Sequence, residues 1–240
     1  MKKKAVAILL LFIVTFSLTS CSKNSKDFKS IKDAQTALLN AQSAKIVATS
    51  VQSTSDGTSE KYTLEATYMV ASDGLIKYCA TQTDSGGKVV SVEYNDGNVF
   101  DRWIIGMGWK SVDPISEDFV TFSRKKPFPL LEIMTQPIDE KEIDKISRAS
   151  TDSITSYSLS LNIQKQKDDM KADGFQEAEF TQLLESSKNI LVDANKIMCG
   201  STDTVKVKDT ESGSETTSVI TTSVSEVNNI KEVVKPQMPN

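Results

Sequence analysis

Regular alternation of apolar and polar residues is the feature that most constrains the fold of this chain. The clearest run places apolar or aromatic side chains at every second position, at Tyr62, Leu64, Ala66, Tyr68 and Val70, with polar residues between them. Successive side chains of a β-strand point to opposite faces of its sheet. The pattern therefore predicts a strand with one buried face and one hydrated face.

Short turns separate this segment from its neighbours. Turn-forming runs at 73–74, 85–87 and 95–98 precede predicted strands at 75–83, 88–94 and 99–105. Asn, Asp and Gly, which make up most of these turns, tolerate the positive φ angles of tight hairpins. Strands joined by so few residues pair antiparallel, because parallel pairing requires a long crossover. The sequence predicts an α+β fold built on a single curved antiparallel sheet.

A few helices are expected to pack against this sheet. Residues 29–43 have apolar positions near one helical face, and a shorter helix is possible at 115–122. From about Phe175 to Met198, apolar residues recur at steps of three and four, which predicts one long amphipathic helix ending at Gly200. Further strands are expected at 143–150 and 157–163, followed by a terminal hairpin within 201–226 that turns at Ser212-Gly213.

The N-terminus has a positively charged start, Lys2-Lys3-Lys4, followed by an apolar run at 5–18 and by Leu18-Thr19-Ser20-Cys21. The apolar run is shorter than the roughly 20 residues of a membrane-spanning helix. The arrangement resembles a bacterial lipoprotein signal peptide with its lipobox. The resemblance implies cleavage before Cys21, a diacylglycerol on its thiol, and a lipid-anchored location on the extracytoplasmic face of the membrane in the bacterial cell envelope. An uncleaved anchor helix is the alternative.

This interpretation divides the chain into a cleaved signal peptide at 1–20, a lipidated stem at 21–29, a single domain at 30–235 and a disordered tail at 236–240. Removal of the signal peptide changes the net charge from −4 to about −7, because three lysines are lost. Nucleic acids attract clustered Lys and Arg, so an acidic chain of this kind is not expected to bind them. The expected partner is the membrane, which the chain contacts through the lipid on Cys21. The sequence identifies no protein partner.

The composition excludes several kinds of catalytic and metal site. The chain has no histidine, which excludes Ser-His-Asp and Cys-His catalysis and every histidine-ligated metal site. Gly106-Met107-Gly108 lacks the third glycine and the lysine of a phosphate-binding loop. The acidic cluster within 139–144 lacks the spacing of a calcium loop. We therefore expect a protein that is not an enzyme and that has no cofactor, metal site or catalytic residue.

Two cysteines remain once Cys21 is lipidated. Cys79 lies in a predicted strand, and Cys199 lies at the end of the predicted long helix. An exported protein folds where disulfides can form, so Cys79 and Cys199 are candidates for a disulfide. The alternative is two separately buried thiols that behave as small apolar side chains.

The order of the predicted elements resembles the half-barrel fold of the LolA lipoprotein carriers and of the mycobacterial LppX/LprG lipoproteins. The resemblance covers about residues 28–235 and depends on element order, on Asn95-Asp96-Gly97-Asn98 before a tryptophan-containing strand, and on a tail that ends near Pro236. It implies a curved sheet that wraps helices and can hold acyl chains between them. The expected function is a non-enzymatic, membrane-anchored binding module for a hydrophobic or lipid-like ligand, whose ligand-binding residues are not assigned. The alternative is a protein-interaction or envelope-structure lipoprotein without a small-molecule ligand.

Overall fold

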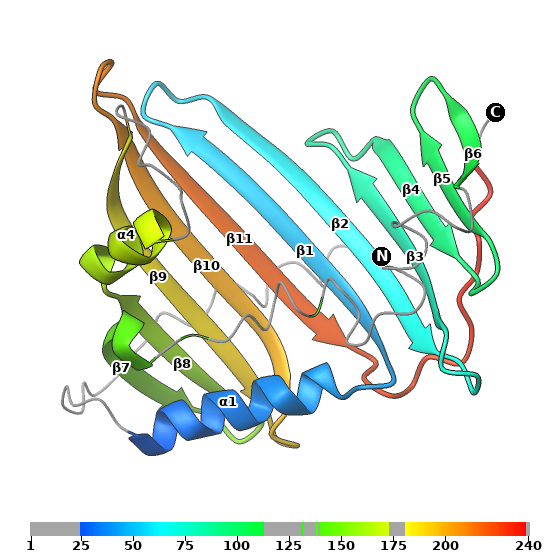
Figure 1. Ribbon diagram of the computed structural model, residues 1–240, viewed down its shortest axis with the longest axis horizontal. Helices are drawn as coiled ribbons and strands as arrows, with labels where there is room; N and C mark the ends of the chain where they lie inside the picture. Colours follow the sequence, from blue (N-terminus) through cyan, green and yellow to red (C-terminus); the bar gives the residue numbers. More distant parts are fainter. Residues whose placement is uncertain (1–24, 113–130, 132–137, 139, 173–180, 239–240) are drawn as a thin grey trace, which may run out of the picture.

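A large open sheet dominates the computed structural model, which describes residues 25–112, 131, 138, 140–172 and 181–238. The described strands form one eleven-stranded sheet in the order β6-β5-β4-β3-β2-β1-β11-β10-β9-β8-β7, and Figure 1 shows its curvature. All neighbouring strands are antiparallel. The strands are β1 (Ser43–Thr54), β2 (Ser59–Val70), β3 (Ile76–Thr83), β4 (Val89–Asn95), β5 (Phe100–Ile104), β6 (Gly108–Val112), β7 (Ile143–Ser150), β8 (Ile154–Leu161), β9 (Thr181–Asp193), β10 (Met198–Asp209) and β11 (Glu215–Ser225).

The sheet consists of two meanders that meet at its centre. β1 to β6 follow one another toward one edge, and β7 to β11 follow one another from the opposite edge. β1 and β11 join the two halves along ten paired positions, from Lys45 opposite Ser225 to Thr54 opposite Thr216. The predicted hairpins at 95–98 and 201–226 are both present, and Gly97 and Gly213 have the positive φ angles that these turns require. The expected single curved antiparallel sheet is therefore confirmed.

One face of the sheet contains most of the core. Ala66 and Tyr68 of β2 are buried there, opposite Ile46 and Ala44 of β1, whereas Glu65 is exposed on the other side. This confirms the two-faced strand predicted from the alternating sequence. We call this apolar side the covered face and the opposite side the back face.

Helix α1 (Ser25–Leu39) packs on the covered face and contacts β9 and β10. Its residues Ile31, Ala34 and Leu38 are at most 2% exposed and fall on one stripe, as the spacing of three and four residues predicts. The helix begins four residues before the predicted start, within the segment assigned to the stem. Inside the helix, Ser30 donates its hydroxyl to the Lys26 carbonyl at 3.0 Å.

The prediction of one long amphipathic helix from Phe175 to Met198 is wrong. Residues 181–193 form β9, in which Ser186, Lys188, Ile190 and Val192 are buried at alternate positions. A tight turn follows, where the Asp193 carboxylate accepts a hydrogen bond from the Ile197 amide at 2.9 Å. The segment forms a strand rather than a helix because it pairs with β10 on one side and with β8 on the other.

Gly200, predicted to end that helix, lies in β10. A Cβ atom at this position would lie 2.9 Å from the Thr222 carbonyl oxygen, so the glycine allows the close approach of β10 to β11. The remaining described helices are the short η1 (Glu140–Glu142) and α4 (Ile163–Ala172), which contacts β9. The helix considered at 115–122 lies outside the described residues, as do residues 175–180.

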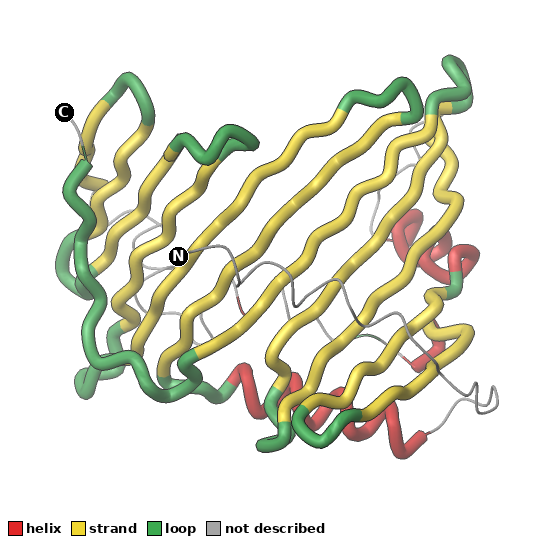
Figure 2. Tube along the Cα trace, turned by 180° about the vertical axis from the view of Figure 1, so that it is seen from behind, coloured by secondary structure: helices red, strands yellow, loops and turns green. Residues whose placement is uncertain are grey.

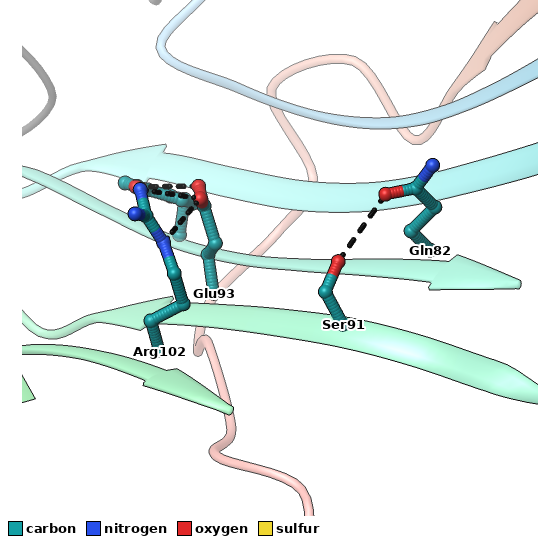
Figure 3. A network of polar contacts seen from close by, with 5 residues as sticks. Gln82, Ser91, Glu93 and Arg102 are labelled. Carbon is teal, nitrogen blue, oxygen red and sulfur yellow. Dashed lines mark hydrogen bonds and ion pairs between the residues drawn. The ribbon is translucent and has the colours of Figure 1, made fainter. Parts of the chain in front are cut away.

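Polar contacts organise the covered face of β3 to β5 (Figure 3). The Glu93 carboxylate of β4 lies 2.9 Å from Nη2 of Arg102 on β5 and accepts a hydrogen bond from the Tyr78 hydroxyl at 3.3 Å. Ser91 donates its hydroxyl to the Gln82 side chain at 3.3 Å. These pairs connect neighbouring strands at the end of the sheet away from α1.

The C-terminal segment crosses to the back face after β11 (Figure 2). Asn228 binds the start of β1, since its amide donates to the Ser43 carbonyl and its side chain accepts from the Gln42 amide at 2.7 Å. Farther along, Lys235 Nζ lies 2.6 Å from Asp101 Oδ2 and 4.3 Å from the centre of the Trp109 ring. The segment is thus attached at both ends of its path from β1 to β6.

Candidate ligand-binding cavity

A cavity of about 440 Å³ lies between α1, η1 and β8, and we call it the front cavity. It opens at the N-terminal half of α1, on the covered face of the sheet. Its volume falls within the range of roughly 300–1,000 Å³ that is typical of small-molecule sites. The lining residues are Phe28, Ile31, Lys32, Gln35, Ile138, Glu140, Glu142 and Leu159.

Helix α1 supplies half of the lining. Phe28, Ile31, Lys32 and Gln35 follow one another at steps of three, one and three residues, which places them on one side of a helix. Leu159, which is 2% exposed, forms the floor from β8. The geometry therefore arises from a helix stripe that is packed over a strand with a buried face.

The helix is attached to the sheet beside this cavity. The Asp27 carboxylate of the first turn of α1 lies 3.7 Å from the Arg148 guanidinium of β7. An acidic group is also favoured near a helix N-terminus, where the helix dipole is positive. The Arg148 guanidinium in turn lies 6.0 Å from the centre of the Tyr157 ring. At the far end of α1, Tyr68 donates its hydroxyl to the Ala41 carbonyl at 3.3 Å.

Apolar side chains lie in the interior of the cavity, and charged groups lie at its rim. Ile31 and Leu159 are 2% exposed and form the packed floor. The half-buried Phe28 presents hydrocarbon surface, and removal of such surface from water contributes about 25 cal/mol per Å². Lys32 and Glu140 are exposed, so their charged groups are hydrated. The arrangement favours a ligand that buries an apolar chain.

Gln35 is the exception within the apolar interior. Its side chain is on the buried stripe of α1 and is 5% exposed, and its Nε2 atom has no hydrogen-bond partner among the residues that the structure describes. A buried donor without a partner costs about 1–3 kcal/mol of stability. Sequence analysis did not single out Gln35, although a polar residue within an apolar helix stripe was a signal that could have identified it.

A second cavity of about 490 Å³ lies on the back face, beneath the C-terminal segment, and we call it the back cavity. Threonine hydroxyls and charged groups dominate its lining. The lining residues are Lys45, Glu65, Thr67, Cys79, Thr81, Thr83, Glu232 and Val234. The described lining of the front cavity includes more aliphatic and aromatic side chains, so the front cavity is the better candidate site for an apolar chain.

The predicted disulfide between Cys79 and Cys199 is not present. Both thiols are free. Cys79 lies on β3 and Cys199 on β10, with three strands between them. Four strand steps correspond to about 19 Å along the sheet, whereas disulfide-bonded cysteines have Cα atoms roughly 4.4–6.8 Å apart. The prediction failed because it placed Cys199 on a helix that was free to pack over β3.

Burial raises the pKa of the Cys79 thiol, and a hydrogen bond with Thr81 only partly opposes this. Burial and the nearby Asp193 carboxylate raise the pKa of the Cys199 thiol. Neither sulfur is therefore primed as a nucleophile, since the thiolate is the reactive form. Cys21, the predicted lipidation site, lies outside the described residues.

Among the described residues, no group of three or more Cys, Asp or Glu side chains is arranged to hold a metal ion. In the same part of the chain, no helix combines the length and the apolar character needed to cross a membrane.

No protein-family model matches the chain, and no curated protein matches its sequence. The fold is similar to the crystal structure of LprF from Mycobacterium bovis, with a TM-score of 0.49 and 10% identity over 89% of this chain and 98% of that one. A LolA superfamily protein from Nitrosomonas europaea matches 81% of this chain and 90% of its own, with a TM-score of 0.29 and 9% identity. At these identities and TM-scores, the similarity supports no functional conclusion for this chain.

Proposed function

We propose that this protein is a non-enzymatic binding module of the bacterial cell envelope that holds the apolar chain of a lipid-like ligand in the front cavity. The observation behind this proposal is a cavity of about 440 Å³ between a helix and a sheet, whose described lining includes Phe28, Ile31, Ile138 and Leu159. Burial of an alkyl chain there would remove hydrocarbon from water, which contributes about 0.8 kcal/mol per CH₂ group.

The chemistry of the lining favours binding over catalysis. Among the described residues, those that line the front cavity include no serine, threonine or cysteine that could act as a nucleophile. The two carboxylates, Glu140 and Glu142, lie on the same short helix η1 rather than on opposite sides of the opening. A bound ligand would therefore be held without meeting a pair of groups arranged for acid–base chemistry.

The lipid anchor would place this cavity near the membrane. Cys21 precedes Ser25, the first residue of α1, by four positions. A fully extended chain covers roughly 3.5 Å per residue, so the start of α1 would lie within about 14 Å of the lipidated residue. Phe28, in the first turns of α1, lines the cavity. A ligand could then exchange between the bilayer and the cavity over a short path.

Two matched variants test the binding site. Phe28→Asp places a carboxylate in the front cavity at a half-buried position, and Val234→Asp places one in the back cavity at a position that is 66% exposed. In titrations with a fluorescent palmitoyl probe, we expect Phe28→Asp to weaken binding at least tenfold, because an alkyl chain cannot solvate a carboxylate. Val234→Asp should bind the probe as the wild type does.

The opposite outcome would contradict the site. If Val234→Asp lost the probe and Phe28→Asp kept it, the binding site would be the back cavity. Purified wild-type protein with no co-purifying lipid and no affinity for the probe would instead support the protein-interaction alternative.

The anchor is tested separately in cells. Metabolic labelling with an alkyne analogue of palmitate should mark the wild-type protein, and Cys21→Ser should lose both the label and its membrane association. Equal labelling of both forms would contradict lipidation at Cys21.

A further inference from the structure

We propose that the front cavity selects a neutral acyl ester, whose carbonyl oxygen accepts a hydrogen bond from Nε2 of Gln35. This inference rests on the proposed function, since it specifies the ligand of the same cavity. Its basis is Nε2 of Gln35, a buried donor with no partner in the described part of the chain, which packing of the apolar core does not explain.

Gln35 is held where an apolar residue would be expected. It lies between Ile31 and Leu38 on the buried stripe of α1 and is 95% buried, yet it lines the front cavity. Buried polar groups in folded proteins nearly always have a partner in the protein or in bound solvent. A ligand with an acceptor atom would supply that partner.

The amide can reach such a ligand through a small motion. Nε2 is shielded from solvent, but Gln35 forms part of the cavity wall. The terminal torsion of a glutamine side chain is broad and two-fold, so rotation about it turns the amide with little strain. The helix does not have to move.

The charges at the rim favour a neutral ligand over a carboxylate. Among the described lining residues, the charged groups are the Glu140 and Glu142 carboxylates and the Lys32 ammonium. A fatty-acid carboxylate at the rim would meet two like charges and one opposite charge, whereas an ester has no net charge to repel. The primary amide of Gln35 can donate a hydrogen bond to a neutral carbonyl oxygen, so an ester needs no cation to be held there.

Three ligands with similar alkyl chains separate these contributions. Methyl palmitate has the neutral carbonyl, palmitate has a carboxylate, and hexadecane has no acceptor. Each is delivered from cyclodextrin and competes with the fluorescent palmitoyl probe on the wild type, Gln35→Leu and Ser201→Ala. Ser201, on β10, is the matched control. Its buried Oγ also lacks a partner among the described residues, but the residue is not part of the front-cavity lining.

For the wild type we expect methyl palmitate to bind roughly three- to tenfold more tightly than hexadecane, the range of one added hydrogen bond. Palmitate should bind more weakly than methyl palmitate at neutral pH, and the difference should shrink as salt is added. Gln35→Leu should bind methyl palmitate and hexadecane with equal affinity. Ser201→Ala should keep the wild-type preference.

Each other result has a distinct meaning. Retention of the ester preference by Gln35→Leu, or tighter binding of palmitate than of methyl palmitate, would overturn this inference while the proposed function stands. Failure of all three ligands to bind the wild type would overturn the proposed function and this inference together. Urea unfolding of both variants shows whether they are folded, and both should be at least as stable as the wild type because each loses an unsatisfied buried group.

Discussion

The two cavities of this protein have similar volumes but are lined by different side chains. The front cavity measures about 440 Å³ and the back cavity about 490 Å³. An apolar helix stripe and a buried strand enclose the first, whereas threonines, charged residues and the C-terminal segment enclose the second. Volume alone would favour the back cavity. The two cavities therefore differ more in the side chains that line them, which depend on the side of the sheet, than in their volume.

The cause lies in the period of two along each strand. Tyr78 of β3 faces the covered side and is buried, while its neighbour Cys79 lies on the back side beside threonines. Apolar packing therefore closes the covered face beneath α1, whereas the ion pair between Lys235 and Asp101 attaches the C-terminal segment to the back face. We therefore expect mutations and pH to affect the stability of the two faces differently.

The largest expected effect is on the apolar side. Leu38 of α1 is fully buried, so Leu38→Ala should destabilise the protein by about 2–5 kcal/mol through lost burial and the cavity that remains. Val234→Ala, at a residue 66% exposed on the wall of the back cavity, should change stability by at most about 0.5 kcal/mol. Urea unfolding followed by circular dichroism measures both. Equal losses would show that the C-terminal segment belongs to the core.

An intermediate effect is expected where the C-terminal segment is attached. Lys235→Met removes the cation that lies 2.6 Å from Asp101, a residue that is 8% exposed. The carboxylate would keep the hydrogen bond that Ser111 donates at 2.6 Å but would lose its countercharge. We expect a loss of about 1–3 kcal/mol, the usual cost of a buried polar group deprived of its partner.

A double-mutant cycle separates the pair from the rest of the segment. In the Asp101→Asn background the carboxylate charge is absent, so Lys235→Met should cost clearly less than in the wild type. An unchanged cost would mean that Lys235 acts through its stacking on Trp109 and Tyr94 instead.

Much of the sheet was predictable because its strands obey a local rule. Alternation identified the strand over 62–70, and Asn-Asp-Gly chemistry identified the hairpin at 95–98, since both signals depend on residues near one another in sequence. The core stripe of α1, with Ile31 and Leu38, was also predictable, although its start was not.

The failures have a different origin. The spacing of the apolar residues in β9 also fits one face of a helix, as at Leu183, Leu184, Ile190 and Leu191. The segment forms a strand because it pairs with β8 on one side and β10 on the other. The front cavity joins α1 to residues more than 100 positions away, so no local pattern identifies it. The disulfide prediction failed for a related reason, because it depended on the helix that was predicted for the segment before Cys199.

Acid should weaken the closure of the back face. Burial raises the pKa of Asp101, but hydrogen bonds from Lys235 and Ser111 and the charge of Lys235 lower it more, so the net pKa lies below the ordinary value of 3.8. A carboxyl with a lowered folded-state pKa stabilises the fold above its unfolded pKa, and this contribution is lost as the pH falls through the folded value. Tryptophan fluorescence, which reports on Trp109 beneath Lys235, should therefore change below about pH 4. Asp101→Asn should lack this transition, and its persistence there would assign it to another group.

The smallest effect is expected at the cysteines. In Cys21→Ser protein purified without reductant, both Cys79 and Cys199 should react with a thiol reagent in denaturant, because three strands separate them in the sheet. In the folded protein both should react slowly at neutral pH, since burial raises the pKa of each thiol. Reductant should leave the melting temperature unchanged, whereas a native disulfide would contribute about 2–4 kcal/mol. Detection of a Cys79–Cys199 disulfide in folded monomer would contradict the strand order on which both cavities depend.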